Sequence, residues 1–266
     1  MLKEVLVQMI NIEKKNNFRL TETTKKSIQN ISSVLNYFKN NDATIYSILV
    51  TLLVEINELF SNYYYNELTK TDLKEFVNLK VSQTEMLFNQ KGTKDIEQLK
   101  SLKRSIGNLT HEVISISHKQ INDIRGHLTE GVCLSYYADS KKEYKGNEIV
   151  DSTFVWDAEF YNDKTYYQYE NGGEIAKSVD IYNFNKIINM IECKTKPIKE
   201  VSKNEHQLYF LEMMQSEIQN YMIDIEVEIN LFILDGYNHL SNELKDTCSH
   251  LGIRVITSKN IINQNI

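Results

Sequence analysis

Residues 178–194 read SVDIYNFNKIINMIECK, and this stretch indicates a β-hairpin. Valine, isoleucine, tyrosine and phenylalanine recur along it, and β-branched and aromatic residues favour strands. The first strand is predicted over residues 178–182 and the second over residues 186–194, with a hairpin loop at residues 183–185. Pro197 ends the second strand, because proline has no N–H to donate to a sheet.

The predicted hairpin carries three charged side chains that can meet. Strand side chains point alternately to opposite faces, so Glu192 and Lys194 share one face of the second strand. Cys193, between them, points to the other face and is interpreted as core packing. Asp180 is the only charged residue of the first strand, and a short loop brings it near Glu192.

Such a group suits a divalent metal ion. Two converging carboxylates raise each other's pKa unless a cation lies between them. Mg²⁺ takes one or two carboxylates together with water and substrate phosphate, and Mn²⁺ is expected to replace it. The ion acidifies a bound water, which Lys194 can orient or deprotonate. The pattern therefore indicates hydrolysis of a phosphodiester, although an acid and a lysine two positions apart also arise as a solvated ion pair.

The C-terminal half alternates strands with helices. It begins with a helix over residues 124–137, and the hairpin lies among several strands. The remaining predicted elements are strands at 149–160, 165–169, 226–234 and 253–257, a turn at 171–173, and helices at 205–221 and 239–250. Antiparallel strands followed by crossover helices predict a mixed sheet with helices on its faces.

The N-terminal half is predicted to be all-helical. Residues 1–125 contain no proline and two glycines, and their apolar residues recur three and four positions apart. The apolar stripes lie at residues 2–10, 28–38, 45–59, 73–79 and 96–124. Residues 44–56 are too short and interrupted to span a bilayer, which predicts a buried helix and no membrane partner. We place the domain boundary between residues 123 and 124.

The distribution of charge and the cysteines bear on how the protein could bind nucleic acid and on its cellular compartment. Residues 1–125 carry 17 Lys and Arg against 14 Asp and Glu, whereas residues 126–266 carry 13 against 22. Binding to a phosphate backbone regardless of sequence depends on clustered basic residues. To bind nucleic acid, the acidic C-terminal half would therefore need a local basic patch or a metal ion, or the contact would come from the N-terminal half. Lys196, Lys199 and Lys203 are candidates for that patch. Three scattered cysteines and no secretory leader predict reduced thiols in a cytoplasmic protein.

The motif resembles that of the PD-(D/E)XK nuclease superfamily. Val179 and Asp180 are followed, after a spacer of 11 residues, by Glu192-Cys193-Lys194. One departure is that Val179 stands where a proline is common. The resemblance implies a restriction-endonuclease-like core in the order α, β, β, β, α, β, preceded here by the all-helical region at residues 1–123.

The resemblance also implies further site residues. In the superfamily the first core helix often supplies a glutamate, which matches Glu130 in the stretch Arg-Gly-His-Leu-Thr-Glu at residues 125–130. The second helix often carries a polar residue near the site, which matches Gln207. Asp180, Glu192 and Glu130 would then bind Mg²⁺, and Lys194 would serve the attacking water.

The implied activity is that of a Mg²⁺-dependent endonuclease of the bacterial restriction or anti-phage defence type, acting on DNA rather than RNA. Cutting both strands of a duplex usually takes two sites, which predicts a homodimer. Residues 1–123 would serve dimerisation, substrate reading or regulation. Two alternatives stay open: a nuclease-like fold that binds nucleic acid or protein without cutting, and a ligand-activated RNA or DNA effector nuclease.

Overall fold

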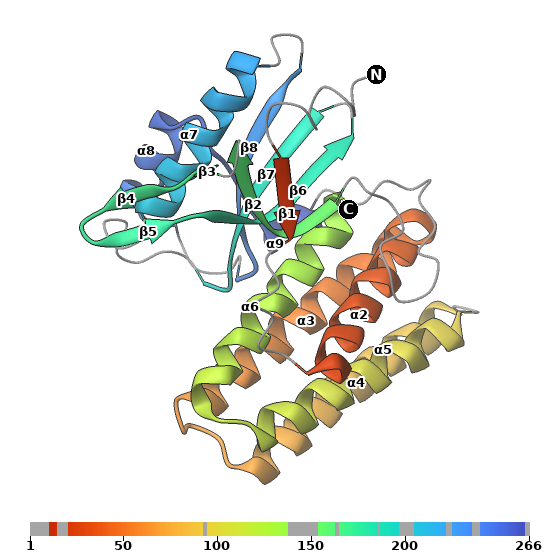
Figure 1. Ribbon diagram of the computed structural model, residues 1–266. Helices are drawn as coiled ribbons and strands as arrows, with labels where there is room; N and C mark the ends of the chain where they lie inside the picture. Colours follow the sequence, from red (N-terminus) through yellow and green to blue (C-terminus); the bar gives the residue numbers. More distant parts are fainter. Residues whose placement is uncertain are drawn as a thin grey trace. The chain divides into compact units, whose positions relative to one another are not determined.

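The computed structural model combines a bundle of helices with a mixed β-sheet (Figure 1). It describes residues 11–14, 21–92, 95–137, 154–162, 165–185, 187–196, 205–221, 225–235 and 240–263. Its contacts divide the chain into two compact units. Residues 1–18 and 151–256 form an α/β unit, and residues 19–150 and 257–266 form a helical unit.

The helical unit contains five long helices and a short one among its described residues. They are α2 (Glu22–Asn41), α3 (Ala43–Tyr64), α4 (Lys70–Lys91), α5 (Ile96–Ser115), α6 (His118–Tyr137) and α9 (Ser258–Asn263). Helix α2 packs on α3, α5 and α6, and α9 packs on α3. Since α9 directly follows the last strand of the sheet, the end of the chain returns to the helical unit.

Local signals set where these helices begin and end. Asp42 caps α3 by accepting a hydrogen bond from the Ile45 N–H at 3.0 Å. Thr69 and Asp72 form a reciprocal capping box at the start of α4. Helix α4 ends at Gly92, whose φ of 67° lies in the left-handed region that glycine adopts at low cost.

Helix α3 is the apolar centre of the bundle. By length and composition it could cross a membrane, but most of its apolar window is buried within the protein. Its buried residues include Leu49, Leu53, Ile56 and Phe60, at the three- and four-residue spacing of one helical face. The prediction of a buried helix is confirmed, although the helix is 22 residues long and exceeds the predicted stretch.

The sheet of the α/β unit is mixed, with strand order β1-β2-β6-β7-β8-β9 and β3 paired to β2. Its strands are β1 (Asn11–Lys14), β2 (Phe154–Asn162), β3 (Thr165–Tyr166), β6 (Ser178–Asn185), β7 (Ile187–Lys194), β8 (Val227–Ile233) and β9 (Arg254–Thr257). Strands β1, β2, β6 and β7 pair antiparallel in turn, and β8 pairs parallel to β7. A separate hairpin consists of β4 (Tyr169–Asn171) and β5 (Glu174–Ala176).

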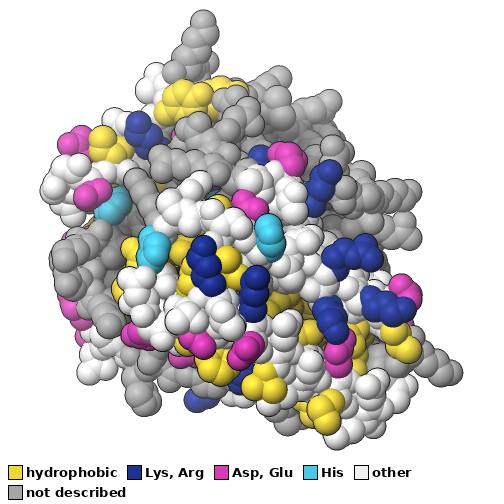
Figure 2. Space-filling model, turned by 90° about the horizontal axis from the view of Figure 1, so that it is seen from below, with side chains coloured by type: hydrophobic (Ala, Val, Ile, Leu, Met, Phe, Trp, Pro, Cys, Tyr) yellow, Lys and Arg dark blue, Asp and Glu magenta, His cyan; other side chains and the backbone are white. Residues whose placement is uncertain are grey.

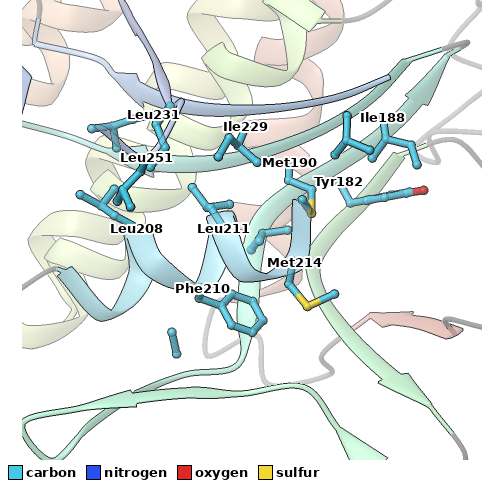
Figure 3. Packing of buried hydrophobic residues seen from close by; sticks show 14 of the residues in the cluster. Tyr182, Ile188, Met190, Leu208, Phe210, Leu211, Met214, Ile229, Leu231 and Leu251 are labelled. Atoms are coloured by element: carbon cyan, nitrogen blue, oxygen red, sulfur yellow. The ribbon is translucent and has the colours of Figure 1, made fainter. Parts of the chain in front are cut away.

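Helix α7 (Glu205–Tyr221) connects the parallel strands β7 and β8. In Figure 3, Leu211 of this helix lies toward Met190 of β7 and Ile229 of β8, and all three belong to one buried apolar cluster. Burial of such side chains stabilises the packing by roughly 1.5–3 kcal/mol each. This cluster fixes the beginning of α7 beside the end of β7. Helix α8 (Asn242–His250) follows β8, and its Leu244 and Cys248 belong to the same cluster.

The observed fold class agrees with the one predicted from the sequence, but several details of the prediction are wrong. The N-terminal half is helical as predicted, except that residues 11–14 form β1. The predicted stripe at residues 2–10 lies outside the described residues. Strand β6 continues to Asn185 and β7 begins at Ile187, so the expected loop residues lie within the strand. Helix α6 runs from His118, across the position chosen for the domain boundary, and belongs to the helical unit.

Candidate active site

The end of the β6–β7 ladder brings Asp180 to the motif on β7. The last backbone pair of this ladder joins Ile181 to Ile191. Beyond it the Asp180 carboxylate accepts a hydrogen bond from the Cys193 N–H, with 2.7 Å between Oδ2 and N. Elsewhere in the ladder a backbone carbonyl of the neighbouring strand accepts such a bond, whereas here the acceptor is a side-chain oxygen. The bond therefore holds the Asp180 carboxylate close to Glu192 and Lys194, which flank Cys193.

Glu192 and Lys194 form a direct ion pair on β7. Lys194 Nζ lies 2.8 Å from Glu192 Oε1. The Glu192 side chain is only 5% exposed and that of Lys194 is 23% exposed. The pair is therefore more buried than a solvated surface ion pair, and the alternative interpretation of these residues as a surface pair does not fit.

Gln207, in the first turn of α7, joins this pair. Its Oε1 accepts a hydrogen bond from Lys194 Nζ at 2.5 Å. The contact depends on α7 packing against β7, since Leu208 and Leu211 belong to the same buried cluster as Met190. The structure thus brings together four of the five predicted site residues: Asp180, Glu192, Lys194 and Gln207.

The acidic neighbours determine the charge of Lys194. Burial by itself lowers the pKa of Lys194, but attraction to Glu192 and Asp180 and the hydrogen bond to Glu192 outweigh it and raise the pKa above its ordinary value of 10.5. Lys194 is therefore an ammonium ion at neutral pH. In this arrangement it supplies positive charge and hydrogen bonds rather than accepting a proton.

Sequence reasoning missed Asp157 on β2. In the β2–β6 register Trp156 pairs with Ile181 and Ala158 with Val179, which places Asp157 opposite Asp180. Asp157 has a φ of 53°, in the left-handed region that non-glycine residues seldom adopt. The available signal was an aspartate within an apolar run, the same signal that identified Asp180.

Glu130, the fifth predicted site residue, belongs to α6 of the helical unit. Its side chain is buried, and its Oε2 lies 2.8 Å from Nδ1 of His127, one helical turn earlier. Buried carboxylates need such partners, because an unpaired charge in a dry interior is costly. Glu130 is thus a structured, hydrogen-bonded acid within its own unit.

The donor set of the α/β unit suits a hard divalent cation. Asp180 and Glu192 offer carboxylate oxygens, and Mg²⁺ takes one or two protein carboxylates with water and substrate oxygens. Among the described residues, no group of three or more His, Cys, Asp or Glu side chains is arranged to hold a metal ion.

Other predicted features lie around the site. Cys193 is buried, in agreement with its interpretation as core packing, and no disulfide joins the three cysteines. Lys196 is exposed just past β7, whereas Lys199 and Lys203 lie outside the described residues. On the face in Figure 2, lysine and arginine side chains are interspersed with acidic and uncharged ones.

No family model matches the chain, and no curated protein matches its sequence. The resemblance to the nuclease superfamily rests on the chain's own residues and stays a prediction.

Proposed function

We propose that this protein is a Mg²⁺-dependent endonuclease that hydrolyses phosphodiester bonds in DNA, with the site at Asp180, Glu192 and Lys194. The observation that carries the proposal is the contact set at the end of β7. Asp180 is anchored to the Cys193 N–H, and Lys194 is held between Glu192 and Gln207. Two acids, one ammonium ion and one amide converge there.

The order of elements supports the proposal. Three antiparallel strands, β2, β6 and β7, are followed by the crossover helix α7 and the parallel strand β8. This is the β, β, β, α, β part of the core that the PD-(D/E)XK resemblance implies. The motif residues lie on β6 and β7, and Gln207 lies on α7.

Each residue of the proposed site would have a different role in hydrolysis. A bound Mg²⁺ or Mn²⁺ would acidify a water and offset charge on the phosphate. Asp180 and Glu192 would hold that ion, and the hydrogen bond to the Cys193 N–H keeps Asp180 in place. Lys194 would orient the attacking water and stabilise negative charge that develops on the phosphate oxygens. Gln207 restricts where the Lys194 ammonium can lie.

Cleavage of supercoiled plasmid tests the proposal. Wild-type protein should nick the plasmid with Mg²⁺ or Mn²⁺ and not with EDTA. Lys194→Ala should lower the rate by at least about 100-fold, the order expected when a group that stabilises developing charge is removed. Lys245→Ala is the control, because Lys245 is an exposed lysine on α8 of the same unit, outside the predicted phosphate patch.

Two results would count against the proposal. Equal nicking by wild type and Lys194→Ala would indicate a contaminating nuclease. No cleavage by wild type of duplex DNA, single-stranded DNA or RNA would instead favour a non-catalytic binding module. Cleavage of RNA but not of DNA would support the proposed phosphodiester hydrolysis and show that the proposed substrate, DNA, is wrong.

A further inference from the structure

Helix α4 has two apolar faces, and among the described parts of the chain other helices contact only one of them. The covered face contacts α3 and α5 and contains Leu73, Val77, Val81 and Phe88. In Figure 1, α4 runs alongside α5 within the helical unit. A helix that packs on one side of a bundle usually turns polar residues outward. Helix α4 departs from this rule.

Four large apolar side chains are exposed on its second face. The exposed fractions are 42% for Phe76, 50% for Leu79, 63% for Met86 and 44% for Leu87. With Gln83, which is also exposed, they recur at spacings of three and four residues and form one stripe. We call these five residues the α4 stripe.

Two charged side chains of α4 are paired with neighbouring helices, and Glu75 is exposed beside the α4 stripe, four positions before Leu79. Lys80 donates to Glu55 of α3 at 2.9 Å, and Glu85 accepts from Lys103 of α5 at 2.9 Å. The stripe itself contains no charged residue. A row of large exposed apolar side chains of this kind marks an interaction site more often than a solvated surface.

We propose that the α4 stripe is a homodimer interface, in which α4 packs antiparallel against α4 of a second copy. A two-fold axis near residue 81 places Phe76 against Met86 of the second copy and Leu79 against its Gln83. A two-fold contact needs a patch that is complementary to itself, and the α4 stripe meets this requirement. Its spacing of three and four residues is that of packed antiparallel helices.

The charges at the two ends of α4 also favour a second copy of the chain as the partner of the α4 stripe. Asp72 lies in the first turn and the exposed Lys91 in the last. Antiparallel pairing brings Asp72 of each copy near Lys91 of the other, and it aligns the helix dipoles in opposite directions. A second copy therefore supplies the complementary charge at both ends.

The size of the surface sets the expected strength. Residues 72–90 span about 27 Å of helix, at roughly 1.5 Å per residue. Such a contact is smaller than a standard interface of about 1,600 Å², so we expect a dimer with a Kd of roughly 1–100 μM. This inference does not depend on the proposed nuclease activity, and its test measures mass rather than cleavage.

Sedimentation equilibrium over about 1–300 μM protein tests the proposal, a range that brackets the expected Kd. Leu79→Glu and Met86→Glu should each weaken dimerisation by at least about tenfold, because each places a charge among the apolar side chains of the contact. Asn78→Glu is the matched control, since Asn78 is exposed on α4 away from the stripe. Circular dichroism checks that each variant keeps its helices.

Cross-linking tests the geometry. The three native cysteines are buried, so a short bis-maleimide should join copies of Gln83→Cys and leave Asn78→Cys monomeric. Loss of the dimer in both stripe variants, but not in Asn78→Glu, would support the proposal. A wild-type protein that stays monomeric at about 300 μM would overturn it, since this exceeds the expected Kd. So would a dimer that is unchanged by Leu79→Glu and Met86→Glu.

Discussion

Replacing Lys194 with methionine removes the ammonium ion of the site and keeps most of the side chain's volume. In the wild type, Lys194 Nζ lies 2.8 Å from Glu192 Oε1 and 2.5 Å from Gln207 Oε1. The variant leaves Glu192, which is 5% exposed, without its cation. Removing one partner of a buried ion pair costs about 3–5 kcal/mol, because the remaining charge is uncompensated.

We expect the lower end of that range, about 3 kcal/mol, because the partly exposed Lys194 side chain lets water screen the pair. A divalent cation should replace part of the missing charge. At about 100 times its Kd, a bound ion stabilises the folded protein by about 2.7 kcal/mol. Mg²⁺ should therefore stabilise Lys194→Met more than it stabilises the wild type.

Urea denaturation with and without Mg²⁺ measures both effects. Circular dichroism follows the unfolding of both units. Lys196→Met, at the exposed lysine, should change the free energy of unfolding by less than about 0.5 kcal/mol. If Lys194→Met is as stable as wild type without metal, the assignment of a buried ion pair is wrong. If Mg²⁺ stabilises neither protein, the metal site is refuted.

Three further outcomes follow from individual contacts. Asp180→Asn keeps an oxygen that can accept the Cys193 N–H but loses the negative charge. The free energy of unfolding should therefore change by less than about 1 kcal/mol, while the affinity for Mg²⁺, measured by calorimetry, falls at least about tenfold. A loss of stability as large as that of Asp180→Ala would contradict this reasoning. Burial raises the pKa of the Cys248 thiol from 9.0 to about 11, so the neutral thiol stabilises the fold below pH 9. That stabilisation, about 2–3 kcal/mol, is lost between pH 9 and 11, and Cys248→Ala should flatten the pH dependence of urea unfolding. In α6, a Cβ at Gly131 would lie 2.8 Å from Cγ2 of Ile28, whereas one at Gly126 meets nothing within 4 Å. Gly131→Ala should therefore destabilise the protein by about 1–3 kcal/mol and Gly126→Ala stabilise it by about 0.5–1 kcal/mol in thermal unfolding, and equal effects of the two would refute the close approach of α2 and α6.

Much of the candidate site could be predicted from sequence, because its core is a local feature. A hairpin fixes register through its short connection, so the order of residues alone places Asp180 near Glu192. The burial of the Glu192–Lys194 pair could not be predicted in this way, since burial depends on what covers the strand. The hydrogen bond from the Cys193 N–H to Asp180 was also unforeseen, because it exists only where the β6–β7 ladder ends.

Contacts between distant segments required the tertiary structure. Helix α7 brings Gln207 to Lys194 only after its apolar residues pack against β7. Asp157 comes opposite Asp180 because β2 pairs with β6. The sequence signal at Asp157 was the same as at Asp180, but only the pairing of β2 with β6 shows that the two positions lie opposite each other.

By itself, the sequence determined the helical N-terminal half, the strand and helix order that follows, and the motif at Asp180, Glu192 and Lys194. Apolar periodicity and turn residues act over a few positions, so one chain segment suffices to read them. Only the tertiary structure decided that residues 11–14 pair with β2 and that α4 keeps an exposed apolar stripe. Both depend on which surfaces of distant segments are in contact, and periodicity shows that a face is apolar without showing what covers it.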